Sequence, residues 1–144
     1  MTVRHILKSK GEASVVTLKP GDTVRDAAAL LSEKRIGTVV ISSDGAACEG
    51  IVSERDIVRE LGARGGEVLD LTLADIMTRE IETCEMGEDN RSVLNRMTEG
   101  RFRHMPVMEG DRMVALISLG DVVKYRLQEV RAERDALTGM VMGH

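Results

Sequence analysis

Two short turns in this chain carry residue types that suit a sugar phosphate. Both have the form Ser-x-x-Asp, at 53–56 and at 118–121, and each follows an apolar run. An ionised carboxylate accepts hydrogen bonds from two hydroxyls at once, which suits the diol of a ribose. A Ser hydroxyl and the free amides at the start of a helix suit a phosphate. Ser and Asp are also preferred helix N-caps, so for either turn alone capping is the competing interpretation.

The two turns lie at equivalent points of an internal repeat. The segments 50–58 (GIVSERDIV) and 115–123 (ALISLGDVV) align, with Ser53 on Ser118 and Asp56 on Asp121. Upstream, the two halves of the chain share identical residues at an offset that is one residue larger. These are Thr17/Thr83, Gly21/Gly87, Arg25/Arg91, Glu33/Glu99 and Arg35/Arg101. The chain therefore contains two copies of one unit.

Each copy is expected to contain a short leading helix followed by a β-α-β-β-α unit. Val24, Ala27, Ala28 and Leu31 recur at helical spacing, and the apolar runs at 36–41 and 102–107 are typical of buried strands. Turn-forming residues mark hairpin loops at 42–46 and 109–112. The glycines of 62–67 end the preceding helix and form a linker.

One repeat is too small to be stable alone, because a lone core below about 70–80 residues yields only a few kcal/mol. The sequence therefore predicts an α+β fold in which the two repeats pack sheet to sheet with pseudo-twofold symmetry. Small ligands would bind in the groove between them. We expect a first repeat at 1–66, a second at 67–124 and a long C-terminal helical extension at 125–144.

Composition excludes several classes of function. The net charge of −4 over 144 residues disfavours non-specific nucleic-acid binding, which depends on Lys and Arg. Cys48 and Cys84 stand alone, without metal-ligand spacing, so we expect neither zinc nor a disulfide framework. No apolar run is long enough for a membrane span, and no signal peptide is visible. We expect a cytoplasmic protein.

These motifs resemble the CBS domain family, named after cystathionine β-synthase. The resemblance runs from about Thr2 to about Lys124 and includes the DIMT opening at 75–78, the HMPV strand at 104–107 and the Ser-x-x-Asp ending found twice. It implies a regulatory pair of domains that binds AMP, ADP, ATP, NAD(H) or S-adenosylmethionine and has no catalytic cofactor. It also implies that the Asp binds ribose, that the Ser and basic residues of the other repeat face phosphate, and that apolar side chains enclose adenine.

The expected ligand residues differ between the two sites. Arg103 and His104 should point toward the Asp56 site, where Arg suits a phosphate. The equivalent residues, Gly37 and Thr38, carry no charge. The Asp121 site would then prefer a less phosphorylated group or obtain its cation elsewhere, with Arg55 and Arg35 as candidates. Arg103 as a solvated charge and His104 as a plain polar residue remain open.

Three further residues are expected near the base. Thr17 and Thr83 occupy equivalent strand positions, where either is also an ordinary β-former. Met105 and the neighbouring methionines are expected to fill core gaps, with contact to adenine as a further role of Met105.

The chain from Asp121 onward is expected to form a long helix that contacts a second copy. Val123, Leu127, Val130, Leu137 and Val141 share one stripe, broken by Arg134, whereas Glu129 and its charged neighbours suggest a solvated face. We therefore predict a homodimer that signals to a protein partner still to be identified. The alternative is a helix that packs on its own core.

Two other functions compete with a nucleotide sensor. Ser, His and Asp supply the letters of a hydrolase triad, but no GxSxG elbow, P-loop or GxGxxG is present. We expect no enzyme activity. A protein-interaction module with empty pockets is the second alternative, which the Asp retained in both copies disfavours.

Overall fold

The computed structural model describes residues 1–10 and 15–141, and these form two compact units that alternate along the chain. Unit 1 contains residues 1–10, 83–107 and 115–141, and unit 2 contains residues 15–82 and 108–114. The leading helix of the first repeat thus belongs to the unit that carries the sheet of the second repeat, and the leading helix of the second repeat belongs to the other unit.

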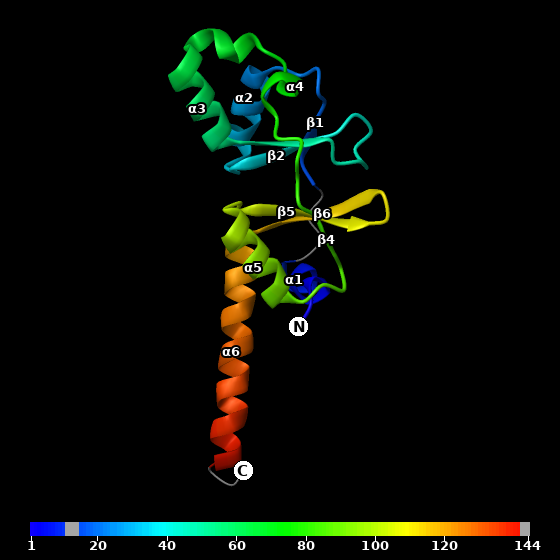
Figure 1. The fold of residues 1–144 in the computed structure, drawn as a ribbon, viewed down its shortest axis with the longest axis vertical. Helices are drawn as coiled ribbons and strands as arrows, with labels where there is room; N and C mark the ends of the chain where they lie inside the picture. The colour runs from blue at the N-terminus through cyan, green and yellow to red at the C-terminus, as the bar shows by residue number, and fades with distance from the viewer. Residues whose placement is uncertain (11–14, 142–144) are drawn as a thin grey trace. The chain divides into compact units, whose positions relative to one another are not determined.

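Unit 2 combines a three-stranded sheet with helices (Figure 1). Its elements are β1 (Thr17–Leu18), α2 (Val24–Lys34), β2 (Thr38–Ile41), β3 (Gly50–Ser53), α3 (Glu54–Arg64), the 3₁₀ helix η1 (Gly66–Asp70) and α4 (Leu73–Ile76). The sheet order is β1-β2-β3, with β1 parallel and β3 antiparallel to β2. This is the strand-helix-strand-strand-helix order expected from the sequence.

The core of unit 2 follows the predicted apolar pattern. Val24, Ala27 and Leu31 are buried on one face of α2. They pack with residues from the sheet, α3, η1 and α4, namely Val39, Ile41, Val52, Ile57, Val68, Leu73, Ile76 and Met77. Gly65, with φ of 81°, ends α3, but the linker predicted at 62–67 is wrong, because residues 62–64 belong to α3 and residues 66–67 to η1.

Unit 1 repeats this arrangement and adds a longer final helix. Its elements are α1 (Val3–Lys10), β4 (Cys84–Glu85), α5 (Asn90–Gly100), β5 (His104–Glu109), β6 (Arg112–Ser118) and α6 (Leu119–Val141). The sheet order is β4-β5-β6. The tip of the β5–β6 hairpin, 108–114, groups with unit 2, where the amide of Met113 donates to the carbonyl of Ala46 at 2.7 Å.

Helix α1 is fixed to unit 1 by backbone and by burial. The amides of Val3 and Arg4 donate to the carbonyls of Glu88 and Met86 at 3.0 and 2.9 Å. Val3 and Ile6 are buried. The C-terminal end of α1 is therefore held in a defined place within this unit.

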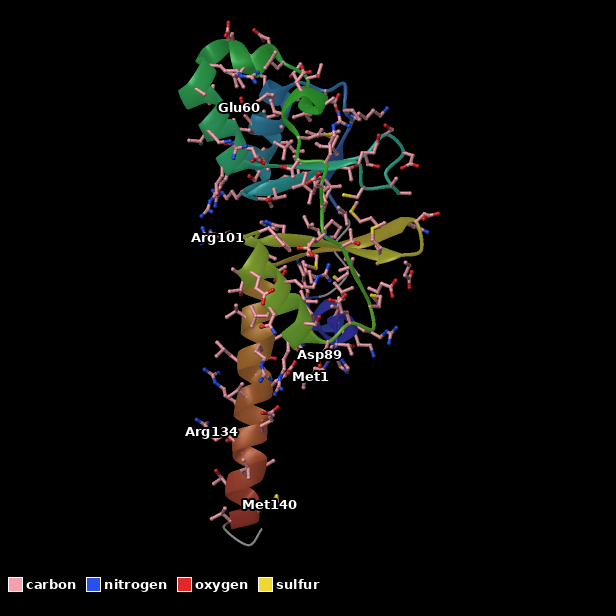
Figure 2. The ribbon with its side chains drawn as sticks, in the orientation of Figure 1. Met1, Glu60, Asp89, Arg101, Arg134 and Met140 are labelled. Atoms are coloured by element: carbon pink, nitrogen blue, oxygen red, sulfur yellow. The ribbon has the colours of Figure 1, made fainter. Side chains whose placement is uncertain are left out.

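The two buried residues of helix α6, Val122 and Glu129, lie in its first half. The helix contacts α5 and α1, and its distal half extends beyond both (Figure 1). Figure 2 shows Arg134 and Met140 on this distal half. Glu129, which the sequence suggested to be solvated, is instead buried at 7% exposure.

The α+β class, the two small sheets and the long C-terminal helix are confirmed. The last three residues of the predicted extension, 142–144, lie outside the described residues. The sheet-to-sheet packing concerns the placement of one unit against the other and stays a prediction, as do the repeat boundaries.

Candidate functional site

The first Ser-x-x-Asp turn joins β3 to α3 in unit 2. Ser53 is the N-cap of α3: its hydroxyl accepts from the amide of Asp56 at 3.2 Å. In return, Oδ2 of Asp56 accepts from the amide and the hydroxyl of Ser53 at 2.8 and 2.9 Å. The turn is thus a closed capping box, and it presents the carboxylate of Asp56 at the point where the strand becomes a helix.

The second turn joins β6 to α6 in unit 1 and has two hydrogen bonds equivalent to those of the first. The amide of Ser118 donates to Oδ2 of Asp121 at 2.9 Å, and the amide of Asp121 donates to the hydroxyl of Ser118 at 3.1 Å. The equivalence predicted from the repeat therefore extends to the atoms of the two turns.

Each turn lies beside the start of the neighbouring strand. Thr38 pairs with Ser53 across β2 and β3, and the amide of Glu54 donates to the carbonyl of Gly37 at 2.9 Å. In unit 1 the amide of Leu119 donates to the carbonyl of Arg103 at 2.7 Å. Gly37 and Thr38 therefore lie next to the turn of unit 2, and Arg103 lies next to the turn of unit 1.

A cation contacts each carboxylate, and the two cations come from different places. Nη2 of Arg59, one helical turn along α3, lies 2.9 Å from Oδ1 of Asp56. Nζ of Lys10, from the end of α1, lies 2.9 Å from Oδ2 of Asp121. Sequence reasoning missed both residues. The i, i+3 spacing was a signal for Arg59, but nothing in the sequence links Lys10 to a residue 111 positions away.

The pKa of Asp121 is lower than that of an ordinary aspartate. Burial opposes ionisation of this half-buried carboxyl, but the hydrogen bonds from the Ser118 amide and from Lys10 outweigh it. A carboxylate held in its charged form accepts hydrogen bonds and donates none, as binding a sugar hydroxyl requires.

The remaining predicted residues lie at different depths. Thr17 is half-buried and pairs with Val40, whereas Thr83 is exposed just before β4. Met105 is fully buried, as a methionine that fills a core would be, and Arg55 is exposed on the first turn of α3. His104 is half-buried at the start of β5.

Both Ser-x-x-Asp turns cap a helix, as the competing interpretation predicted. The same capping box also occurs at two helices where no ligand was expected. Thr23 and Asp26 cap α2 with two reciprocal hydrogen bonds of 3.0 and 3.1 Å. Thr72 and Asp75 form a similar box at α4. The turns at 53–56 and 118–121 differ in that each follows a sheet strand, adjoins the start of the strand that precedes that strand in the chain, and holds a cation on its carboxylate.

Comparison with known proteins identifies the family. The model of the CBS domain matches residues 3–63 and 73–128. The chain belongs to the CBS domain family. It is 30% identical to the mitochondrial CBS domain-containing protein CBSX3 of Arabidopsis thaliana over 149 aligned positions, which cover 99% of this chain and 72% of the relative.

Solved CBS structures share this fold. The CBS-domain containing protein ATU1752 from Agrobacterium tumefaciens is 36% identical, with a TM-score of 0.82 over 88% of this chain and 99% of that one. Two more distant structures share the fold at 22% and 23% identity, with TM-scores of 0.77 and 0.73. They cover 90% and 84% of this chain and 98% and 89% of their own. The first is the CBS pair of MJ0100 in complex with 5′-methylthioadenosine and S-adenosyl-L-methionine, and the second is PAE2072 from Pyrobaculum aerophilum complexed with AMP.

Neither a membrane-spanning helix nor a metal-binding cluster occurs among the described residues. Within residues 1–10 and 15–141, no helix is long and apolar enough to cross a bilayer. The same residues hold no group of three or more His, Cys, Asp or Glu placed to bind a metal ion.

Proposed function

We propose that this CBS pair is a regulatory module that binds an adenosine-containing ligand, of the AMP, ATP or NAD(H) type, at its two Ser-x-x-Asp turns. The observation that carries the proposal is the duplicated turn, with one carboxylate, one hydroxyl and one cation in each copy. A ribose diol suits the carboxylate and a phosphate suits the cation and the helix start. The module performs no catalysis of its own.

The ligands of the two distant relatives support the adenosine part of this proposal. AMP, 5′-methylthioadenosine and S-adenosylmethionine differ in charge and in their 5′ groups, and they share the adenosine. Residues 17, 37, 38, 83, 103, 104 and 105 are the other proposed ligand contacts, with the base enclosed by apolar side chains and Arg103 on the phosphate of the Asp56 site.

The proposed signal is a conformational change read by a protein partner. A ligand that contacts both repeats favours the arrangement to which it binds more tightly, and it shifts the equilibrium only by that difference in affinity. Such a module would report the ratio of adenosine ligands, as an energy or redox sensor does. Nucleic acid is not a proposed partner.

Substitution of both carboxylates tests the proposal, and the chain contains a matched control. The Asp56→Ala/Asp121→Ala variant loses two capping boxes, each worth about 1 kcal/mol of stability. Asp26→Ala loses the equivalent box at α2, which lies at neither turn. Calorimetric titration with AMP, ATP, NAD⁺ and S-adenosylmethionine should show binding to wild type and to Asp26→Ala, and at least a tenfold weaker affinity for the double variant.

Each other result has a clear meaning. Equal affinity of a folded double variant for adenosine compounds would contradict the role of the carboxylates. No binding of any adenosine compound by wild type would favour an interaction module with empty pockets, and turnover of the ligand would favour an enzyme.

We further propose that the module is a homodimer in which the two copies meet along α6. Its apolar stripe is exposed, with exposures of 39% for Val123, 51% for Leu127, 44% for Val130, 61% for Leu137 and 84% for Val141. The spacings of four, three, seven and four residues follow a heptad pattern, with Arg134 at the interrupted position. A stripe of this kind is covered most simply by the same stripe of a second copy.

Sedimentation at micromolar concentration tests the dimer. Wild type should sediment at twice the chain mass, and Leu127→Glu/Leu137→Glu should sediment as a monomer. Gln128→Glu, also exposed on α6 but outside the stripe, is the matched control and should stay dimeric. Monomeric wild type would refute the proposal.

The proposed location is the cytoplasm. Cys48 and Cys84 are both free thiols, which a reducing compartment would preserve. Fractionation of cells that express the tagged protein tests this location, and enrichment in an organelle would contradict it.

A further inference from the structure

The carboxylate of Asp121 is bound by a residue that the repeat does not account for. Lys10, the last residue of α1, directs Nζ to Oδ2 of Asp121 at 2.9 Å and to the carbonyl of Leu116 at 3.2 Å. All three residues belong to unit 1, so this contact is internal to one compact body. Because α1 is held to the loop before α5 by its own backbone hydrogen bonds, Lys10 reaches this carboxylate from a fixed starting point.

The ion pair leaves two atoms available for a ligand. An ammonium group has three N–H donors, and two of these meet Asp121 and Leu116. Within residues 1–10 and 15–141, the hydrogen bonds to Asp121 end on Oδ2, from Ser118 and Lys10, and none ends on Oδ1. One acceptor oxygen and one ammonium donor therefore lie side by side in a half-exposed position.

The Asp56 turn lacks this combination. Its Oδ2 accepts from Ser53 and its Oδ1 accepts from Arg59, so both oxygens of the carboxylate are engaged. Arg59 belongs to the same helix as Asp56 and its side chain is 64% exposed. The two turns therefore match in backbone and differ in the source of the cation and in the free oxygen.

We propose that Lys10 is the phosphate-selecting residue of the Asp121 site. This inference rests on the proposed function and deepens it. The carboxylate alone would repel an anionic ligand, and Lys10 neutralises it. Oδ1 of Asp121 then accepts a ribose hydroxyl while the third donor of Lys10 binds a phosphate oxygen. Lys10 supplies a cation to the Asp121 turn from within unit 1.

The test compares AMP with adenosine, since the two probes differ only in the phosphate. Titration calorimetry is performed on the full chain with Asp56→Ala in the background, so that the Asp121 site alone is read. The measured quantity is the ratio of the two dissociation constants, adenosine over AMP. Lys10→Met keeps the aliphatic stem and removes the charge. It should lower this ratio about tenfold, the worth of one partly exposed charge-assisted hydrogen bond.

Two control variants separate charge from structure. Lys10→Arg keeps a cation and should retain most of the preference for AMP. Lys8→Met removes an exposed lysine of the same helix and should leave the ratio unchanged. Thermal melts that match wild type establish that all three variants fold. Raised salt should weaken AMP binding to the Lys10 protein more than to Lys10→Met, because screening acts on the charge.

The results that would overturn the role of Lys10, the Asp121 site and the proposed function differ from one another. An unchanged ratio in Lys10→Met overturns the role of Lys10 and leaves the proposed function standing. Binding of both probes by wild type and of neither by the Asp56→Ala background overturns the Asp121 site itself. If wild type binds neither probe, the proposed function falls and this inference falls with it.

Discussion

Substitution of the buried Glu129 tests how α6 is held against the rest of unit 1. Oε1 of Glu129 accepts from Nδ2 of Asn90 at 2.6 Å, and Oε2 accepts from Nη1 of Arg126 at 2.9 Å. Asn90 is fully buried, and its Oδ1 already lacks a hydrogen-bond partner among the described residues. Glu129→Ala would leave this amide unpaired at both ends and would remove the carboxylate that faces Arg126.

The magnitude follows from burial. Stranding a buried amide donor costs about 1–3 kcal/mol. The ion pair with Arg126, whose side chain is 21% exposed, adds no more than about 1 kcal/mol after solvent screening. We expect Glu129→Ala to lower the free energy of unfolding by about 2–3 kcal/mol, which corresponds to a Tm about 8 °C lower for a chain of this size.

Glu133 provides the matched control on the same helix. Its side chain is 60% exposed, and its ion pairs with Arg91 and Arg126 span 3.9 and 3.8 Å. Glu133→Ala should therefore cost less than about 0.5 kcal/mol. Urea unfolding followed by circular dichroism measures both variants at one protein concentration, because association shifts apparent stability. Equal losses for the two variants would refute the argument from burial.

Three further outcomes are expected. Gly50→Ala should lower the unfolding free energy by about 1–3 kcal/mol, because its Cβ would lie 2.5 Å from Sδ of Met77, whereas Gly62→Ala, with open space around it, should raise it by about 0.5–1 kcal/mol. The reverse order in urea melts would contradict this packing. Burial raises the pKa of Cys84 to about 12, so its thiol should resist a thiol-specific reagent at pH 8 until the protein unfolds, and labelling of the native protein there at the rate of a free thiol would contradict it. The lowered pKa of Asp121 gives its charged form a stabilising effect that is present above the ordinary value of 3.8 and lost as pH falls through the folded value. The stability difference between wild type and Asp121→Asn should therefore shrink from pH 7 toward pH 3, and a constant difference would refute it.

The fold was predictable because the repeat presents the same apolar spacing and the same turn residues in two copies. The apolar spacing that runs from Val24 to Leu31 predicted the buried face of α2, and Gly65 ends α3 as expected. The turns at 53–56 and 118–121 were predicted as strand-to-helix junctions, and both are. Sequence could not decide between a helix cap and a ligand site, because a carboxylate and a hydroxyl at this spacing suit both purposes.

Contacts between distant segments lay beyond local pattern. Glu129 looks like any exposed glutamate on a charged helix, and only the position of Asn90 on α5 shows that it is buried. The ion pair of Lys10 with Asp121 likewise depends on how α1 docks, which no spacing in the sequence encodes. Each leading helix lies in the unit that carries the sheet of the other repeat, and this assignment also depends on contacts between distant segments.

The difference between the two cations follows from where each enters the fold. Arg59 lies one turn of α3 from Asp56, so both partners of this ion pair belong to one helix. The pair therefore does not depend on how other elements dock. Lys10 belongs to α1, which is held to unit 1 by backbone hydrogen bonds to Glu88 and Met86 and also contacts α6. A ligand that engages both Lys10 and Asp121 therefore bridges two elements that the local repeat does not join. Since a ligand shifts an equilibrium only by the difference in its affinity for the two states, the proposed binding of a ligand at the Asp121 turn would stabilise the docking of α1.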